Sequence, residues 1–448
     1  MTIDSTSLIN EITLIAAPQR RMYHLLTAEL TFDTTVVNVF RVATLRRYAN
    51  YTDNYAEEWI IDLVINKGLY NTYLIDNQDK LNINLYIDSS YPGQPPNITK
   101  LTMRAFPKNT TDDRVKQNRS ADLNQGEVGK LELEVYQFEL LDLAVEQMRV
   151  MQTGGNYPVT SAASVLRVLM GGAGAMLDLP LEQKPKAPDM IAPDTEVVKN
   201  MVAVKQGTNL CDLPGYLQHH YGLYNTQMGS FYHDRSWYIW PLYNTKRFEL
   251  ANKTLTLINV PADRFPDIET TFQRRGSSVV ILLTGDSVYE DSSNQQQYNE
   301  GNGTRAVRAS AMSGDEGRIV DKGQVLLQRS QTNTEIMTNN RRTGVQNAPS
   351  ATEITDNTSR VLSRTATVNG TTAQFTWQSS DPALIFPGMP VKLLYLKDEK
   401  VVQRYGVLIA VESQYRLANP GLIDTSFLAD TALTVFISNA DDEYNTSL

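Results

Sequence analysis

Alternation of apolar and polar residues is the feature that most limits what this chain can fold into. It is clearest in residues 131–140, Leu-Glu-Leu-Glu-Val-Tyr-Gln-Phe-Glu-Leu, and it recurs in 81–88 and 101–106. Because successive side chains of a strand point to opposite faces, such stretches predict strands with one buried and one wet face. Residues 36–42 and 58–65, which are rich in β-branched and apolar side chains, extend the set. We therefore expect the N-terminal part to curl into a closed, barrel-like sheet that hides its edges.

Helical patterns follow in the middle of the chain. Residues 161–170 are strong helix formers, and the two glycines after them predict that the helix ends there. A second helix is expected over 209–221, with a proline near its start and a glycine just after its end. Residues 140–151 also fit a helix, and the proline-rich segment 184–193 is typical of an extended linker.

Strands are expected again towards the C-terminus, on both sides of a long polar stretch. The predicted strands are 230–233, 237–243, 255–260, 277–284, 373–377, 385–395, 401–416 and 432–437. The polar stretch, 285–360, is rich in Asn, Gln, Ser, Thr, Gly and Arg. A loop of that length is uncommon inside a compact domain, so we expect an extended arm with one or two short strands near 319–328. Such an arm can become ordered against a neighbouring subunit.

The predicted fold class is therefore mainly β (α+β). It comprises two β-barrel-like domains, a small helix-containing insert domain and a long polar arm. The expected division is 1–140 for the N-terminal barrel-like domain, 141–284 for the insert and short hairpins, 285–360 for the arm, and 361–448 for the C-terminal barrel strands.

Charge and cysteine content exclude several function classes. The net charge of −9 argues against broad nucleic-acid binding, which needs basic surface. The isolated pairs Arg20-Arg21, Arg46-Arg47 and Arg341-Arg342 favour solvated or interface charges over a nucleic-acid groove. Cys211 is the single cysteine, so neither an intrachain disulfide nor a thiolate metal cluster can form.

Targeting and membrane signals are weak as well. The run 279–283 is far shorter than the ~20 apolar residues that span a bilayer. The first residues have neither a basic nor an apolar signal region, which predicts a chain made in a cytosol and not inserted in a membrane.

The histidines and the acidic residues form no convincing catalytic or metal-binding pattern. His219, His220 and His233 suggest a metal site with Cys211, but adjacent side chains on a helix point about 100° apart. An ordinary helix end is therefore the favoured interpretation. The glycine-rich residues 171–175 follow a helix and lack the lysine of a phosphate loop. No motif singles out a carboxylate pair among 50 acidic residues, so we predict no catalytic, cofactor-binding or metal-binding residues.

Two places resemble the hub proteins of contractile-tailed phage baseplates and related injection machines. The first is Asp381-Pro-Ala-Leu-Ile-Phe-Pro-Gly-Met-Pro-Val391, followed by a hairpin and then 405–411. It resembles the family's closing barrel hairpin. The second is the predicted helix 213–222 with the strand 237–242, which resembles the small domain between the two barrels.

This resemblance implies a structural virion protein without enzyme activity or cofactors. Three copies would form a ring, the baseplate hub, that joins the tail tube protein to the central spike or tip protein. The chain would then be assembled in the bacterial host cytoplasm and reside in the virion tail, beside other baseplate proteins. The alternatives are another tail adaptor or fibre-attachment protein, or a cell-wall-degrading tail enzyme.

Overall fold

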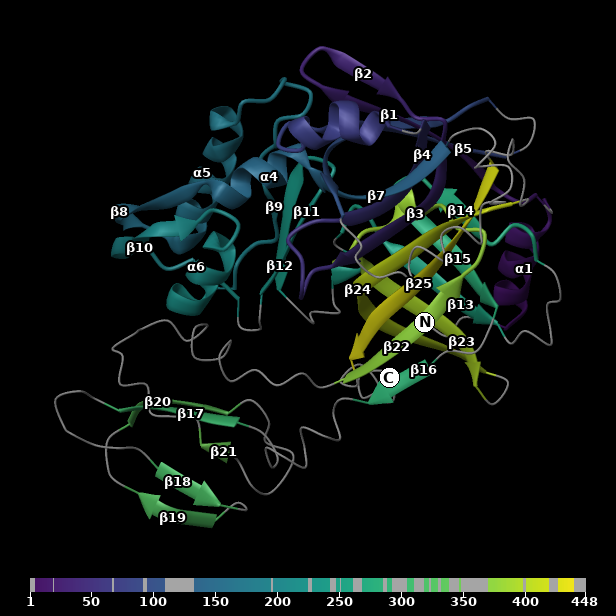
Figure 1. Cartoon of the computed structure of the whole chain (residues 1–448). Coiled ribbons are helices and arrows are strands. Elements are labelled where there is room, and N and C mark those ends of the chain that lie inside the picture. Colours follow the sequence, from purple (N-terminus) through teal and green to yellow (C-terminus); the bar gives the residue numbers. More distant parts are fainter. Residues whose placement is uncertain are drawn as a thin grey trace.

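The structure is a computed structural model. It describes residues 5–18, 20–66, 68–91, 95–108, 133–194, 196–224, 228–241, 247–249, 251–260, 268–284, 288–291, 304–309, 318–321, 324–328, 332–337, 346–347, 370–397, 400–418 and 426–438. Within these residues the chain is mainly β, as predicted, with a few helices (Figure 1).

The first curled sheet is formed mostly by N-terminal strands. Its spatial order is β24, β3, β4, β7, β6, β5, β1 and β25, and the pairing of β24 with β25 closes it into a barrel. The strands are β1 Tyr23–Phe32, β3 Arg41–Asn50, β4 Glu58–Asn66, β5 Asn82–Ser90, β6 Ile98–Pro107, β7 Leu133–Asp142, β24 Lys400–Leu417 and β25 Ser426–Ser438. Their alternation fills the interior: Ile83, Leu85 and Ile87 of β5 are all buried. The alternating stretches 81–88, 101–106 and 131–140 therefore predict β5, β6 and β7, but not that β24 and β25 complete the sheet.

The second curled sheet uses the other halves of the same two long strands. Its order is β14, β15, β13, β23, β24, β25, β22 and β16. The additional strands are β13 Leu255–Val260, β14 Phe272–Arg275, β15 Ser278–Thr284, β16 Val288–Asp291, β22 Gly370–Trp377 and β23 Pro390–Lys397. Side chains connect the β14 and β22 sides. Thr271 Oγ1 accepts from Trp377 Nε1 at 3.0 Å and donates to Gln378 O at 2.8 Å.

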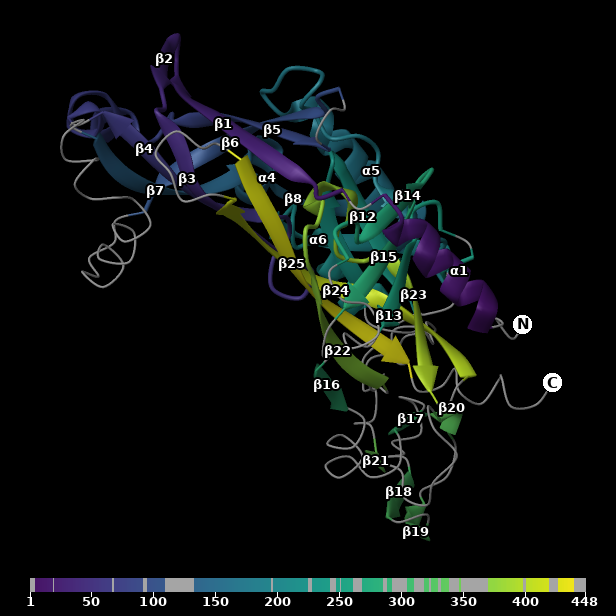
Figure 2. The ribbon, with the colours of Figure 1, turned by 90° about the vertical axis from the view of Figure 1, so that its right-hand side faces the viewer.

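Strands β24 and β25 pass from one sheet into the other, as Figure 2 shows. Strand β24 pairs with β23 up to Val407 and with β3 from Ala410, and its pairing with β25 shifts register between Leu408 and Ala410. Such an irregularity bends a strand and increases its twist. A side chain at Gly406 would meet the Phe436 carbonyl oxygen, so glycine is required at the crossing. Two C-terminal strands thus complete a sheet whose other strands lie far earlier in the sequence.

The insert domain lies beside both sheets and has a core of its own. It comprises α4 Leu143–Val150, β8 Gln152–Thr160, α5 Ala162–Met176, β9 Asp189–Met190, β10 Lys199–Asn209, α6 Leu213–Tyr221, β11 Met228–His233 and β12 Ser236–Pro241. Trp237, Leu166 and Leu213 are among its buried residues. Helix α6 has a proline in its first turn and ends at Gly222, whose φ is +67°, so the predicted second helix is confirmed.

Three local predictions were wrong. Helix α5 does not end at Gly171 but continues to Met176, because Ala173 is still buried in the insert core and Gly174 packs closely on Pro185. The stretch 36–42 is not one strand: β2, Thr35–Asn38, pairs with β1 and is separate from β3. The stretch 385–395 is not one strand either, since β23 begins only at Pro390, after the turn at Gly388. The linker 184–193 is largely extended, as expected, and β9 within it pairs in parallel with β12.

Several elements had no counterpart in the sequence-based expectations, among them β1, the strands β8 and β10 of the insert, and β14 and β16 of the second sheet. Helix α1, Ser5–Ala16, was not expected either; it places Leu8, Ile12 and Ile15 against Ile258 and Leu282 on the second sheet.

Short strands also occur within the predicted polar arm. Strand β18, Arg318–Asp321, pairs with β19, Gln324–Gln328, which confirms the strands expected near 319–328. Strand β17, Thr304–Ala309, lies between β20, Thr332–Met337, and β21, Gln346–Asn347. Short helical turns at Tyr70–Leu74, Ile75–Asn77 and Pro382–Leu384 complete the described elements. The rest of the arm, and residues 131–132 and 242–243 of two predicted strands, lie outside the described residues.

Candidate functional site

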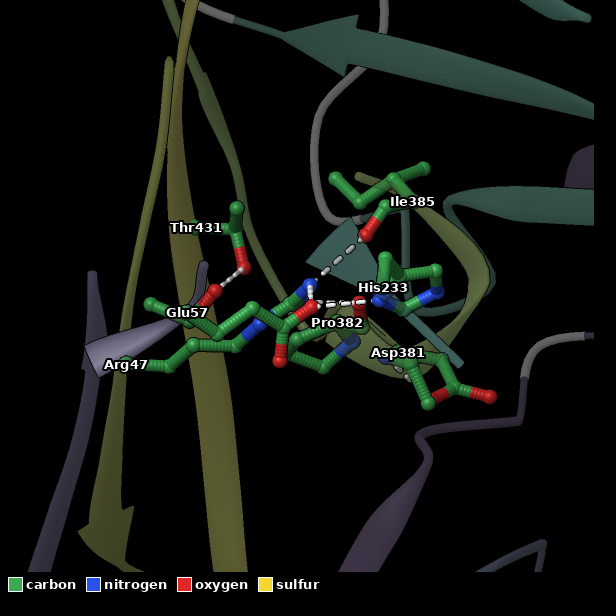
Figure 3. Close-up of polar contacts among 9 residues, drawn as sticks. Arg47, Glu57, His233, Asp381, Pro382, Ile385 and Thr431 are labelled. Carbon is green, nitrogen blue, oxygen red and sulfur yellow. Dashed lines mark hydrogen bonds and ion pairs between the residues drawn. The ribbon is translucent and has the colours of Figure 1, made fainter. Parts of the chain in front are cut away.

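A buried arginine lies where the first sheet, the second sheet and the insert meet (Figure 3). Arg47 projects from β3, and its side chain is only 1% exposed. Its Nη1 donates to the carbonyl oxygen of Pro382, and its Nη2 donates to that of Ile385 at 2.9 Å. The Pro382–Leu384 turn leads into β23 of the second sheet. One guanidinium therefore fixes the loop before β23 against the first sheet.

The same guanidinium also connects to the insert through a carboxylate. Arg47 Nη2 lies 2.5 Å from Glu57 Oε1, and Glu57 Oε1 accepts a hydrogen bond of 2.7 Å from Nδ1 of His233. His233 ends β11 of the insert, and its ring stacks on Phe386 with centroids 4.6 Å apart. The chain Arg47–Glu57–His233, named here the junction network, thus joins all three parts of the molecule.

The charges of the junction network stabilise one another. Burial disfavours the Glu57 carboxylate, but attraction and hydrogen bonds from Arg47 and His233 outweigh it and lower the Glu57 pKa to about 2. A carboxyl whose pKa is lowered on folding adds stability above its unfolded pKa near 4.5, and this is lost as the pH falls towards 2. Glu57 is therefore a permanent anion at neutral pH, which suits a structural ion pair and not a proton donor.

Asp381, beside this network, has the opposite character. Its Oδ1 accepts from the backbone N–H of Ala383 at 3.3 Å and so begins the short Pro382–Leu384 turn. Burial raises the pKa of Asp381 to about 6, although that hydrogen bond and the Arg47 charge act against the shift. The junction therefore combines one strongly stabilised carboxylate with one that is costly to ionise.

A cleft of about 580 Å³ opens beside the junction network. Its walls come from the first sheet, the start of α4, the β11–β12 turn and residues 182–183. Charged residues of both signs line it: Arg47, Glu57, Lys100, Asp142, Glu182, Asp234, Arg235 and Lys253. Balanced charge of this kind gives no strong preference for an anionic or a cationic ligand.

Asp142 is the second half-buried carboxyl group of the cleft. Its Oδ1 accepts from the backbone N–H groups of Ala144 at 2.8 Å and Val145 at 3.3 Å, so it caps α4. Burial raises its pKa, while those two hydrogen bonds oppose the shift. One carboxyl with a raised pKa and one with a lowered pKa in a cleft is an arrangement used in acid–base catalysis. Both groups nevertheless have structural partners within the chain.

The histidines of the suspected metal site are not brought together. His219 and His220 lie at the end of α6 with ring centroids 4.9 Å apart, and His220 packs on Tyr216. His233 belongs to the junction network. Cys211 is buried, and burial raises the pKa of its thiol to about 12. Among the residues that the structure describes, no group of three or more His, Cys, Asp or Glu side chains is placed to hold a metal ion. None of the described helices is long and apolar enough to cross a bilayer.

Sequence reasoning missed the junction network. It treated Arg46-Arg47 as isolated charges, whereas Arg46 is exposed and Arg47 is among the largest fully buried side chains. The signal was present in the alternation of β3, because Arg47 falls in register with the buried Leu45 and Ala49. An arginine in the inward phase of a strand predicts a buried partner.

Comparison with known proteins gives matches by structure only. No protein-family model matches the chain, and no curated protein matches its sequence. The chain is similar to the tail protein from Neisseria meningitidis MC58, with 8% identity, 92% of this chain and 96% of that chain covered, and a TM-score of 0.47. It is also similar to the 43 kDa tail protein of prophage MuSo2 from Shewanella oneidensis, with 8% identity, 91% of this chain and 97% of that chain covered, and a TM-score of 0.46. A third similar structure is the lidded Francisella PdpA-VgrG complex, with 6% identity, 97% of this chain and 56% of that chain covered, and a TM-score of 0.49.

These structural neighbours are two tail proteins, a p2 virion baseplate and a PdpA-VgrG complex. At identities of 8% or less and TM-scores below 0.5, the likenesses carry no weight for what this chain does.

Proposed function

We propose that this chain is a structural protein of a phage tail or related injection machine, and more specifically the baseplate hub between tail tube and spike. The observation that carries the proposal is the fusion of two curled sheets through β24 and β25, with an insert fixed to both by the junction network. Strands hydrogen-bonded into both sheets prevent the sheets from moving independently. Such rigidity suits a joint between two parts of a larger assembly.

The segment that resembles a baseplate-hub motif occupies the centre of this joint. Its Pro387-Gly388 turn has a glycine φ of +94°, and the Gly388 N–H donates to Leu408 O at 2.8 Å. Arg247 Nη2 donates to the Gly388 carbonyl oxygen, also at 2.8 Å. The turn therefore directs β23 against β24 near the crossing point, which is the role that the resemblance implies for a closing hairpin.

The assembly implied by this role remains part of the proposal. Three copies form a ring that contacts the tail tube protein on one side and the spike or tip protein on the other. The same hypothesis includes the virion location, the assembly in the host cytoplasm and the lack of enzyme activity. It also includes the division of the chain into 1–140, 141–284, 285–360 and 361–448. An adaptor or fibre-attachment protein would occupy a different place in the same particle.

Labelling of intact particles tests the placement directly. Gold-labelled antibodies against this chain are expected to mark the tip-proximal end of purified tails in electron micrographs. Label along the tube or on the fibres would place the chain elsewhere. Absence of the chain from purified particles would reject a virion protein altogether.

The cleft supports a second candidate, a cell-wall-degrading enzyme. The specific observation is the pair Asp142 and Glu57, whose pKa values are shifted in opposite directions. The purified chain should release no soluble fragments from peptidoglycan if the structural proposal is right. Release that is abolished by Asp142→Asn, in a variant with an unchanged circular dichroism spectrum, would establish the enzyme instead.

A further inference from the structure

An apolar hollow lies between helix α1 and strand β14. It has a volume of about 340 Å³ and is lined by Leu14, Ile15, Pro18, Arg20, Tyr91, Thr270, Phe272, Gln273 and Arg274. Leu14 is 61% exposed at its edge, while Phe272 is buried beneath it. Arg20 and Arg274 are exposed and give the rim positive charge. A hollow with an apolar floor and basic rim suits an apolar side chain flanked by carboxylates.

The end of α5 presents a segment with that chemistry. In residues 176–182, Met-Leu-Asp-Leu-Pro-Leu-Glu, Met176 is 78% exposed and Leu181 is 86% exposed. Leu181 is the most exposed of the large apolar side chains in the described residues. Asp178 and Glu182 are also exposed, so acidic groups flank the apolar ones. Exposed apolar residues that are rimmed by polar groups form candidate contact surfaces.

The hollow and this segment lie on opposite sides of the molecule. In Figure 1, α1 and β14 are at the right, and α5 is at the left beyond the first sheet. One copy therefore cannot fill its own hollow with its own segment. Two different complementary patches on opposite sides are what a head-to-tail contact between identical chains requires, and such contacts close into rings when the rotation permits.

We propose that residues 176–182 of one copy insert Leu181 and Met176 into the α1–β14 hollow of the next copy, with Asp178 facing Arg274 and Glu182 facing Arg20. The inference rests on the proposed function for the existence of a ring, and it adds the surfaces through which the ring forms. The partner is a second copy because this chain itself carries both halves of the contact: an apolar segment flanked by carboxylates and an apolar hollow flanked by arginines.

Cysteine cross-linking between full-length chains tests the contact. Cys211 is buried, so introduced cysteines react with little background. A Leu181→Cys chain mixed with a Leu14→Cys chain and a short bismaleimide should give a cross-linked pair containing one copy of each, identified by mass spectrometry. Either chain alone should give none.

Two results would overturn the inference. One is cross-linking of the Leu181→Cys chain with itself, which would indicate a two-fold symmetric contact. The other is no mixed product from a chain that sediments as an oligomer, which would place the interface elsewhere. Neither result bears on the antibody labelling, so the hub proposal survives or falls separately.

Charge exchange provides a second, independent measurement. Arg274→Glu and Asp178→Arg should each raise the dissociation constant for self-association by roughly tenfold in sedimentation velocity experiments. The two changes in one chain should restore the original dissociation constant, because the Arg274–Asp178 charge pair is then reversed at every contact. Ile98→Asp is the matched control: Ile98 is 60% exposed on β6, outside both patches, and its replacement should leave association unchanged. Equal weakening by all variants, without recovery in the double variant, contradicts the proposed pairing.

Discussion

At the junction network the first sheet meets its neighbours through buried ions, whereas the β14–β22 side of the second sheet is held by an indole and a hydroxyl group. Arg47, Glu57 and His233 form the first contact, and Trp377 with Thr271 forms the second. Ionic contacts depend on protonation and on every partner being present, because an isolated buried charge is costly. A neutral contact inside an apolar core depends on shape and does not change between pH 4 and 8. The two regions should therefore respond differently to mutation and to acid.

The largest loss in the free energy of unfolding is expected when the Trp377 side chain is removed from the neutral contact. Trp377→Ala removes a fully buried indole from the core of the second sheet together with its hydrogen bond to Thr271. The free energy of unfolding should fall by about 5 kcal/mol, as for other buried large-to-small changes. Urea unfolding followed by tryptophan fluorescence and circular dichroism measures it. Trp377→Phe, which keeps a six-membered aromatic ring but loses the pyrrole ring and its N–H donor, should cost about 2 kcal/mol. Equal losses for the two variants would mean that shape does not dominate here.

Breaking the ionic contact at Arg47 should lower the free energy of unfolding slightly less than Trp377→Ala does. Arg47→Met leaves the Glu57 carboxylate without its main cation and frees the carbonyl groups of Pro382 and Ile385, so about 4 kcal/mol should be lost.

Two further variants sharpen this prediction. Arg46→Met on the same strand is the control, because Arg46 is exposed, and its effect should be near zero. Adding Glu57→Gln to Arg47→Met should recover part of the loss, since the Glu57 charge that the first change leaves unpaired is then removed. A double variant as unstable as the sum of the singles would show that the charges are not coupled.

The next largest effect is expected from acid, which should lower the free energy of unfolding through protonation of His24. His24 is fully buried, with its ring nitrogens 2.9 Å from Ser89 Oγ and from Ser380 O, and burial lowers its pKa to about 4. Because the unfolded chain takes up this proton first, the contribution of His24 to stability is complete above about pH 6.5 and falls by about 3 kcal/mol as the pH drops to 4. His24→Gln should flatten the curve of unfolding free energy in that window. A His24→Gln curve that falls between pH 7 and 4 by as much as the wild-type curve contradicts the prediction.

The smallest predicted effect is a gain in the free energy of unfolding. Asp381 is costly to ionise, so its charge destabilises the fold as the pH rises through about 6. Asp381→Asn still accepts the Ala383 N–H and should raise the free energy of unfolding by about 1 kcal/mol at pH 8. At pH 4 the difference should nearly vanish, because the wild-type carboxyl is then protonated in the folded state. A loss at pH 8 would show that the carboxylate is needed by Arg47.

Local patterns predicted most strands, because alternation reports burial directly. β5 and β7 are close to the expected ranges, and β13 coincides with its range. Helix α5 was misjudged because tertiary contacts around Ala173 and Gly174 override the tendency of glycine to end helices. Pairing between distant strands was also beyond sequence reasoning. Nothing near Ala410 indicates that β24 changes its partner from β23 to β3 there.

The junction network was hidden for the same reason. Arg47, Glu57 and His233 come from separate segments, and only the folded chain places Glu57 Oε1 within 2.7 Å of His233. The signal available in the sequence was the inward phase of Arg47 on its strand. The partners of that arginine could not be named, because a strand's periodicity gives the side on which a residue lies but not what lies opposite.

The shared strands also set the order in which the molecule can be made. Residues 23–142 supply six strands of the first sheet, but the ribosome must deliver residues 400–438 before that sheet can close. During nearly all of translation, β1 and β3 present open edges that invite pairing with other chains. A nascent chain of this design needs a chaperone, or rapid association with its own copies, until its last strands emerge.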